Sequence, residues 1–106
     1  MLRVMALTRA FDDRMYRAQR QGKTSFYMKC TGEEAVSVAQ GMALRPGDML
    51  FPSYRNQGLY MVRGKPLVEL MCQLLSNTRD MSKGRQLPVM YHWTPGRIFS
   101  ISGNLT

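Results

Sequence analysis

The sequence predicts a mainly helical fold with about two short strands. Apolar residues recur at spacings of three and four over residues 2–21 and again over residues 67–75, as on one face of a helix. Two brief apolar runs, 48–51 and 98–101, are bounded by turn residues and have the length of short strands. A chain of 106 residues forms one domain at most, so we treat residues 1–106 as a single unit.

The first predicted helix covers residues 2–21. Its apolar stripe consists of Val4, Leu7, Phe11, Met15 and Ala18. Charged residues lie off this stripe, and Gly22 stands where a helix commonly ends.

The second predicted helix begins at a capping box, Thr31-Gly32-Glu33-Glu34, and ends near Leu44. In this motif the Thr31 hydroxyl accepts from the amide three residues on, while Glu34 reaches back to the Thr31 amide. The box accounts for both acids, so we predict no acid–base role for them.

Two shorter helices and a loop follow. We predict a helix over residues 54–63 capped by Ser53, and another that starts at Pro66 and ends at Asn77. Residues 78–97 have no clean period and contain several Gly and Pro residues, which predicts a long surface loop.

The charge, the cysteines and the apolar content of the chain argue against several classes of protein. The formal net charge is +8, but Lys and Arg are scattered and form no run of five, which favours a solvated basic face over a nucleic-acid-binding module. Cys30 and Cys72 are far apart and lie in no metal-binding spacing, as expected of a reduced intracellular protein. The sequence contains no run of eighteen apolar residues, so it predicts no membrane-spanning helix. We therefore expect a cytoplasmic protein of the bacterial type.

Tyr54 and Arg55 form the first candidate site. They follow a predicted strand and Pro52, at the expected start of a helix, where free backbone N–H groups favour phosphate. Arginine adds a planar fork of donors that matches phosphate oxygens. A solvated Arg beside a packed Tyr remains the alternative.

The second candidate site is the small-residue turn formed by Ser102, Gly103 and Asn104. Such a turn after a strand lets a ligand approach the backbone closely. Two other polar features have simpler explanations. We expect the loop around Lys83 to be anchored by hydrogen bonds from Arg85. We expect His92 to be a polar residue on the surface of this loop.

Several of these stretches together resemble one family. Residues 25–58, 83–91 and 101–105 resemble the alpha subunit of thiamine-diphosphate-dependent 2-oxo acid dehydrogenases, the E1 component. The resemblance extends from about Leu7 to Thr106. Asn, Gln and Gly follow Arg55 where the pyruvate type usually has His and Gly, so the branched-chain type is the better match.

The resemblance implies a parent fold of the doubly wound α/β thiamine-diphosphate-binding type, with the two short strands as parallel neighbours. It implies that Tyr54, Arg55 and Gly103 contact the cofactor. It also implies that Ser102 and Asn104 supply part of a monovalent cation site. We expect both candidate sites to line one crevice.

The same resemblance implies that some groups needed for catalysis are absent from these 106 residues. Magnesium is held in the family by a Gly-Asp-Gly stretch, which these 106 residues lack, and the activating carboxylate comes from the beta subunit. A family alpha subunit is several times longer and works with the beta subunit and a lipoyl-bearing E2. We therefore expect this chain alone to bind no cofactor and to be inactive. The alternative is a non-catalytic small helical domain, and in either case we expect a homo-oligomer.

Overall fold

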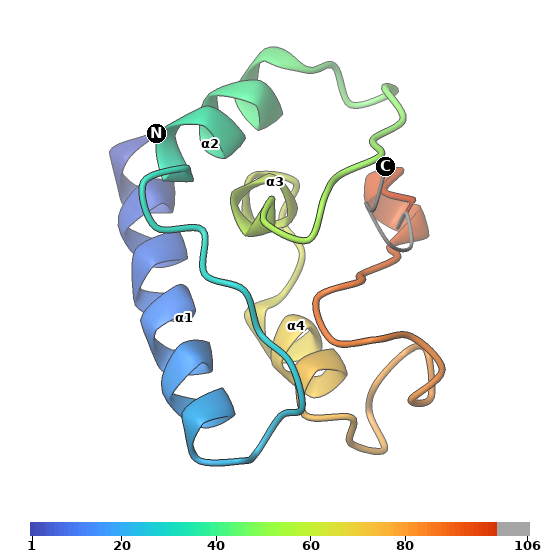
Figure 1. Cartoon of the computed structure of the whole chain (residues 1–106). Coiled ribbons are helices and arrows are strands. Elements are labelled where there is room, and N and C mark those ends of the chain that lie inside the picture. Colours follow the sequence, from blue (N-terminus) through green and yellow to red (C-terminus); the bar gives the residue numbers. More distant parts are fainter. Residues whose placement is uncertain (100–106) are drawn as a thin grey trace.

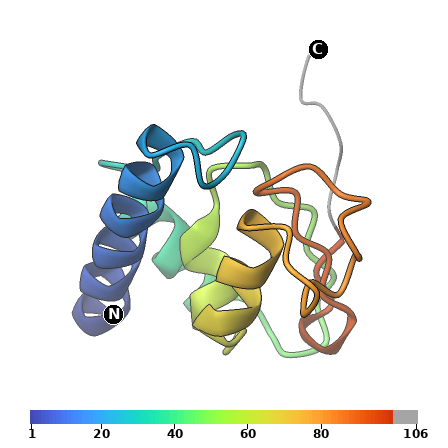
Figure 2. The same cartoon turned by 90° about the horizontal axis from the view of Figure 1, so that it is seen from below.

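The computed structural model describes residues 1–99 and contains four α-helices. Their bounds are α1 (Leu2–Arg20), α2 (Glu34–Ala43), α3 (Gln57–Val62) and α4 (Leu67–Leu74), and a short 3₁₀ turn, η1, covers Thr94–Gly96. Helices α1, α2 and α3 pack pairwise, with α3 in the middle of the molecule (Figure 1). The irregular C-terminal segment lies on the side opposite α1, beyond α4 (Figure 2). No helix within residues 1–99 combines the length and apolar character needed to cross a bilayer.

Helix α1 confirms the first predicted helix, but the face that it buries differs from the predicted apolar stripe. Phe11, Met15 and Ala18 are buried as predicted, but Leu7 is exposed. Thr8 is buried in its place, because its hydroxyl donates to the Val4 carbonyl at 2.7 Å and lies 3.3 Å from the Met61 sulfur.

The predicted capping box is wrong. Helix α2 begins at Glu34 without a side-chain capping bond. The Thr31 hydroxyl donates instead to Asp12 at 3.4 Å, and Glu34 accepts from the Gly32 amide at 2.8 Å while pairing with Arg9. Side chains of α1 thus take the partners that the local pattern had assigned to α2.

The third helix is shorter than predicted, and Ser53 does not cap it. The Ser53 amide and hydroxyl both donate to the Asn56 side-chain oxygen, at 2.7 and 2.8 Å, which closes a turn before α3. Tyr54 and Arg55 therefore belong to this turn and not to a helix. Residues 78–97 form a long loop as predicted, apart from η1, but Val89 and Tyr91 are buried in the core, so the loop does not lie wholly on the surface.

Neither predicted strand forms within residues 1–99. In the described part of the chain, the segment 48–51 meets residues 98 and 99 at an isolated parallel bridge between Leu50 and Ile98. The Leu50 amide donates to the Arg97 carbonyl and the Phe99 amide to the Leu50 carbonyl, each at 2.8 Å. The pairing is parallel, as expected, but Ile98 also pairs with Trp93 in an antiparallel bridge, and no sheet forms among residues 1–99.

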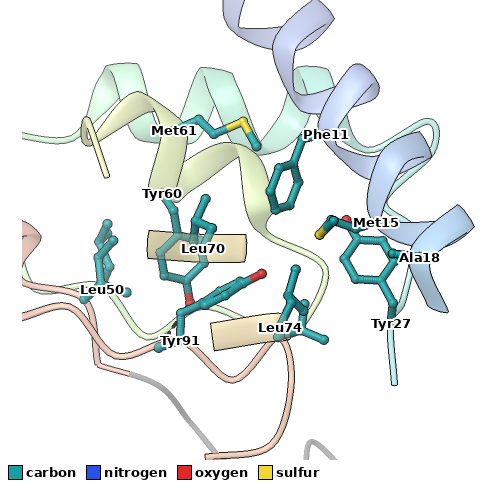
Figure 3. Close-up of a cluster of buried hydrophobic side chains, with 12 residues drawn as sticks. Phe11, Met15, Ala18, Tyr27, Leu50, Tyr60, Met61, Leu70, Leu74 and Tyr91 are labelled. Atoms are coloured by element: carbon teal, nitrogen blue, oxygen red, sulfur yellow. Dashed lines mark hydrogen bonds between the residues drawn. The ribbon is translucent and has the colours of Figure 1, made fainter. Parts of the chain in front are cut away.

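The core lies between α1, α3, α4 and the C-terminal segment (Figure 3). Tyr60 and Tyr91 pack edge to face with ring centroids 4.9 Å apart, and Phe11 and Tyr27 do so at 6.5 Å. Edge-to-face aromatic pairs of this kind add to the stabilisation from burial itself. The core thereby joins the irregular segments to the helices.

Candidate functional site

The turn at residues 53–56 presents the predicted anion-binding pair. The Arg55 amide donates to the Ser53 hydroxyl at 3.3 Å, which fixes the backbone of the turn. The Arg55 guanidinium carbon lies 5.6 Å from the centre of the Tyr54 ring. The Arg55 side chain is 42% exposed, so its outer nitrogens remain accessible to a ligand.

Arg55 is only partly satisfied by the protein. One terminal nitrogen lies 3.7 Å from a carboxylate oxygen of Glu33, which precedes α2. The Arg55 Nε is buried and has no hydrogen-bond partner within residues 1–99. The buried Nε is covered by the protein, so the exposed part of the guanidinium is what an anion can reach. Its N–H donors match the oxygens of an anion such as a phosphate.

A buried polar cluster begins at Gln57, directly after this turn, and joins α3 to α1. Gln57, the first residue of α3, donates to the Met28 carbonyl at 2.9 Å and lies 3.5 Å from the Tyr27 hydroxyl. That hydroxyl donates to Asp12 at 2.7 Å, and the Cys30 amide donates to the same carboxylate at 3.1 Å. The cluster holds the 27–31 segment between α1 and α3.

Electrostatics in this cluster follow from burial. Burial raises the pKa of Asp12, while hydrogen bonds from Tyr27 and Cys30 oppose the rise. Burial and the neighbouring Asp12 also raise the pKa of the Cys30 thiol to about 12, so this cysteine is a poor nucleophile. The cluster is therefore structural support and not a reactive centre.

Asp12 was missed by sequence reasoning, although a signal for it exists. It stands four residues after Thr8 and three before Met15, on the face of α1 that is buried. An acid on a buried helical face needs partners, and that need predicts a polar cluster of this kind.

The loop around Lys83 is anchored differently from the prediction. Asp80 accepts from the Ser82 amide and hydroxyl, at 3.0 and 2.6 Å, and from the Gly84 amide at 2.8 Å. The Arg85 side chain makes no hydrogen bond within residues 1–99. The anchor is therefore the buried Asp80 carboxylate, and the expectation for Arg85 was wrong.

The second candidate site cannot be compared with the Tyr54–Arg55 turn. Ser102, Gly103 and Asn104 lie outside the described residues, so the shared crevice stays a prediction. His92 is exposed, and its Nε2 lies 3.2 Å from the Thr94 hydroxyl oxygen. In the described part of the chain, no three His, Cys, Asp or Glu side chains are grouped to hold a metal ion.

Comparison with known proteins decides the family. Residues 2–106 match the family described as "Dehydrogenase E1 component". The chain belongs to this family. Within the E1 component family, it is 59% identical over 98% of its length to the 2-oxoisovalerate dehydrogenase subunit alpha of Pseudomonas aeruginosa, of which it covers 25%.

Two mitochondrial relatives match nearly the same share of the chain at lower identity. The 2-oxoisovalerate dehydrogenase subunit alpha of Homo sapiens and subunit alpha 2 of Arabidopsis thaliana are each 41% identical over 95% of this chain. The chain covers 23% and 21% of these two relatives. It thus spans about a quarter or less of the length of these relatives.

Proposed function

We propose that this chain is part of the alpha subunit of a branched-chain 2-oxo acid dehydrogenase, in which Tyr54 and Arg55 contact the diphosphate of thiamine diphosphate. The observation that carries the proposal is the Arg55 side chain, which is 42% exposed and whose guanidinium has one ion-pair contact within residues 1–99, at 3.7 Å to Glu33. The names of the relatives support the branched-chain assignment.

The chemistry of the pair suits a diphosphate. A guanidinium offers parallel N–H donors that match two phosphate oxygens, and its charge does not depend on pH in the physiological range. The Tyr54 ring, 5.6 Å from the guanidinium carbon, limits the directions in which Arg55 can extend. Arg55 therefore binds and orients the diphosphate, and the bound cofactor supplies the carbanion stabilisation that decarboxylation requires.

The proposed whole reaction is oxidative decarboxylation of a branched 2-oxo acid with acyl transfer to lipoamide. Magnesium ligands and the activating carboxylate come, in this proposal, from other segments and from the beta subunit, and a lipoyl-bearing E2 accepts the acyl group. The chain alone is then inactive. An assay of the isolated chain with thiamine diphosphate, magnesium and a branched 2-oxo acid should give no turnover. Turnover above that of an Arg55→Ala variant would contradict this.

Titration with inorganic pyrophosphate, followed by NMR, tests the site itself. We expect saturable shifts at residues 53–58 with a dissociation constant on the order of 1 mM, because one Arg and a few amides support only a loose contact. Arg55→Gln should abolish these shifts. Arg79→Gln is the matched control, since Arg79 is also exposed but lies outside the turn. Shifts confined to the arginines of α1 would show that the charge is only surface.

Self-association is the second proposal, and exposed apolar side chains favour it. Val36 and Met42 on α2 are each 58% exposed, and Phe51 is 63% exposed. Val36 and Phe51 border an apolar groove of about 540 Å³ between α2 and the 50–52 segment. Large exposed apolar patches commonly mark association surfaces.

Other apolar residues of α2 and α4 are not available to a partner. Val38, Leu70 and Leu74 are buried in this chain, so they are not available to a partner. Light scattering during size exclusion should show a homodimer or larger, and Phe51→Ser should shift it toward monomer. A monomeric wild-type chain at high micromolar concentration would contradict this second proposal.

A further inference from the structure

A cavity lies between α4 and the 80–92 loop, away from the Tyr54–Arg55 turn in sequence. Its volume is about 320 Å³, at the lower end of the range for small-molecule sites. The lining residues that matter here are Lys65, Glu69, Met81, Arg85, Met90 and Tyr91. None of the residues that surround this cavity belongs to the turn at residues 53–56.

Lys65 gives the cavity a buried cation. The residue is 6% exposed, and its ammonium donates to Glu69 at 3.0 Å. Its other neighbours are soft: the Met81 sulfur at 4.0 Å and the Trp93 ring, whose centre is 5.0 Å away. An ammonium has three N–H donors, and the protein provides one oxygen for them within residues 1–99. The remaining donor capacity favours a ligand with an acceptor oxygen.

Arg85 provides a second cation at the same cavity. The loop that carries it is fixed without its help, because Asp80 accepts three hydrogen bonds from Ser82 and Gly84. Most of the acceptor capacity of the Asp80 carboxylate is thereby used within the loop. The Arg85 side chain has no hydrogen-bond partner within residues 1–99, so its N–H donors are available to a ligand in the cavity.

Charge and shape together define the ligand class. Lys65 and Arg85 balance Glu69 and Asp80, so a dianion would leave the site strongly negative, whereas a single carboxylate adds one charge. Met81, Met90 and Tyr91 line the rest with apolar surface. We propose that this cavity binds a small monocarboxylate with an apolar body, with its carboxylate held by Lys65 and Arg85. This proposal stands independently of the thiamine diphosphate assignment.

Butyrate and butyramide are the probes that test it, because they have the same shape and differ in charge. In an NMR titration of the 106-residue chain, butyrate should give saturable shifts at the cavity residues, with a dissociation constant on the order of 1 mM. Butyramide should bind at least about tenfold more weakly, since it loses both charge-assisted hydrogen bonds.

Three variants complete the test. Lys65→Met and Arg85→Gln should each weaken butyrate binding by about tenfold. Lys83→Gln is the matched control, because it removes a charge from the same loop at an exposed position outside the lining. If Lys65→Met does not fold, Arg85→Gln decides alone. The proposal is overturned if butyrate gives no saturable shifts, if butyramide binds equally well, or if Arg85→Gln leaves binding unchanged.

Discussion

Two irregular segments pack against the helices, and each is hydrogen-bonded to a buried aspartate. The two aspartates differ in how far along the sequence their hydrogen-bond donors lie. Asp12 in α1 holds the 24–33 segment through Tyr27 and the Cys30 amide, which are fifteen or more residues away in sequence. Asp80 holds the 80–92 loop through Ser82 and Gly84, within four residues of itself.

The range of these bonds determines what each carboxylate stabilises. Asp12 joins α1 to a segment that also contacts α3 through Gln57, so its bonds form only when the helices are packed. Asp80 closes a local turn that could form without the rest of the core. Loss of Asp12 should therefore weaken the whole fold, while loss of Asp80 should affect the loop alone.

The largest expected effect comes from Asp12→Ala. The substitution leaves the Tyr27 hydroxyl and the Cys30 amide buried without an acceptor, and should lower the free energy of unfolding by about 3 kcal/mol. Urea denaturation followed by circular dichroism measures this change. Asp13→Ala is the control, because Asp13 is the neighbouring acid on the solvent side of α1 and pairs with Lys29. Equal effects of the two substitutions would contradict a special role for Asp12.

The next effect concerns the pH dependence of the same region. The hydrogen bond from Arg9 lowers the pKa of Glu34 below its ordinary value of 4.5, against an opposing effect of burial. A lowered pKa in the folded state means that Glu34 stabilises the fold above about pH 4.5 and loses this contribution as the pH falls further. Asp12 acts with the opposite sign, since burial raises its pKa.

Glu34→Gln isolates the Glu34 contribution from that of Asp12. We expect the variant to be less stable than the wild type by about 1 kcal/mol at pH 7, and this difference to shrink as the pH falls below 4.5. Urea midpoints measured between pH 7 and pH 3 test this. Glu33→Gln, at an exposed position, serves as the control. A stability difference that stays constant over this pH range would show that the charge of Glu34 does not matter.

A smaller and more local effect is expected at the second region. Asp80→Asn replaces an acceptor of three hydrogen bonds by a weaker one, so the amides of Ser82 and Gly84 should exchange faster with solvent. Global stability should change by less than about 1 kcal/mol, because the loop is also held through Gln73, which bonds Leu87 and Val89. Hydrogen exchange by NMR separates the two quantities. A loss of stability as large as that of Asp12→Ala would remove the distinction between the regions.

These regions also show where sequence reasoning succeeds. The α1 helix and α4 were predictable because their apolar periodicity reports burial directly. The capping box failed because Asp12 and Arg9, distant in sequence, bind Thr31 and Glu34 more favourably than the local pattern does. Local motifs specify possible partners, and tertiary packing selects among them.

The candidate site shows the same limit. Tyr54 and Arg55 were proposed as the start of a helix after an apolar run, whereas the structure places them in a turn before α3. Ser53, however, bonds Asn56 instead of capping a helix, so the helix-terminus argument for phosphate does not apply. The partial pairing of Arg55 with Glu33 could not be inferred, because it depends on how α2 and the turn are brought together.

The smallest expected effect concerns the ion pair between Arg55 and Glu33. It tests most directly whether Arg55 binds an anion. Glu33 lies 3.7 Å from Arg55 and is half exposed, so it competes only modestly with an incoming anion. Glu33→Gln should strengthen pyrophosphate binding by about two- to fivefold, since exposed ion pairs are worth at most about 1 kcal/mol. The same NMR titration at residues 53–58 provides the measurement, and Glu69→Gln, which removes a distant acid, is the charge-matched control. If both variants bind equally more tightly, net charge alone explains the gain. A specific gain in Glu33→Gln would show that Glu33 occupies the position where Arg55 meets its anion.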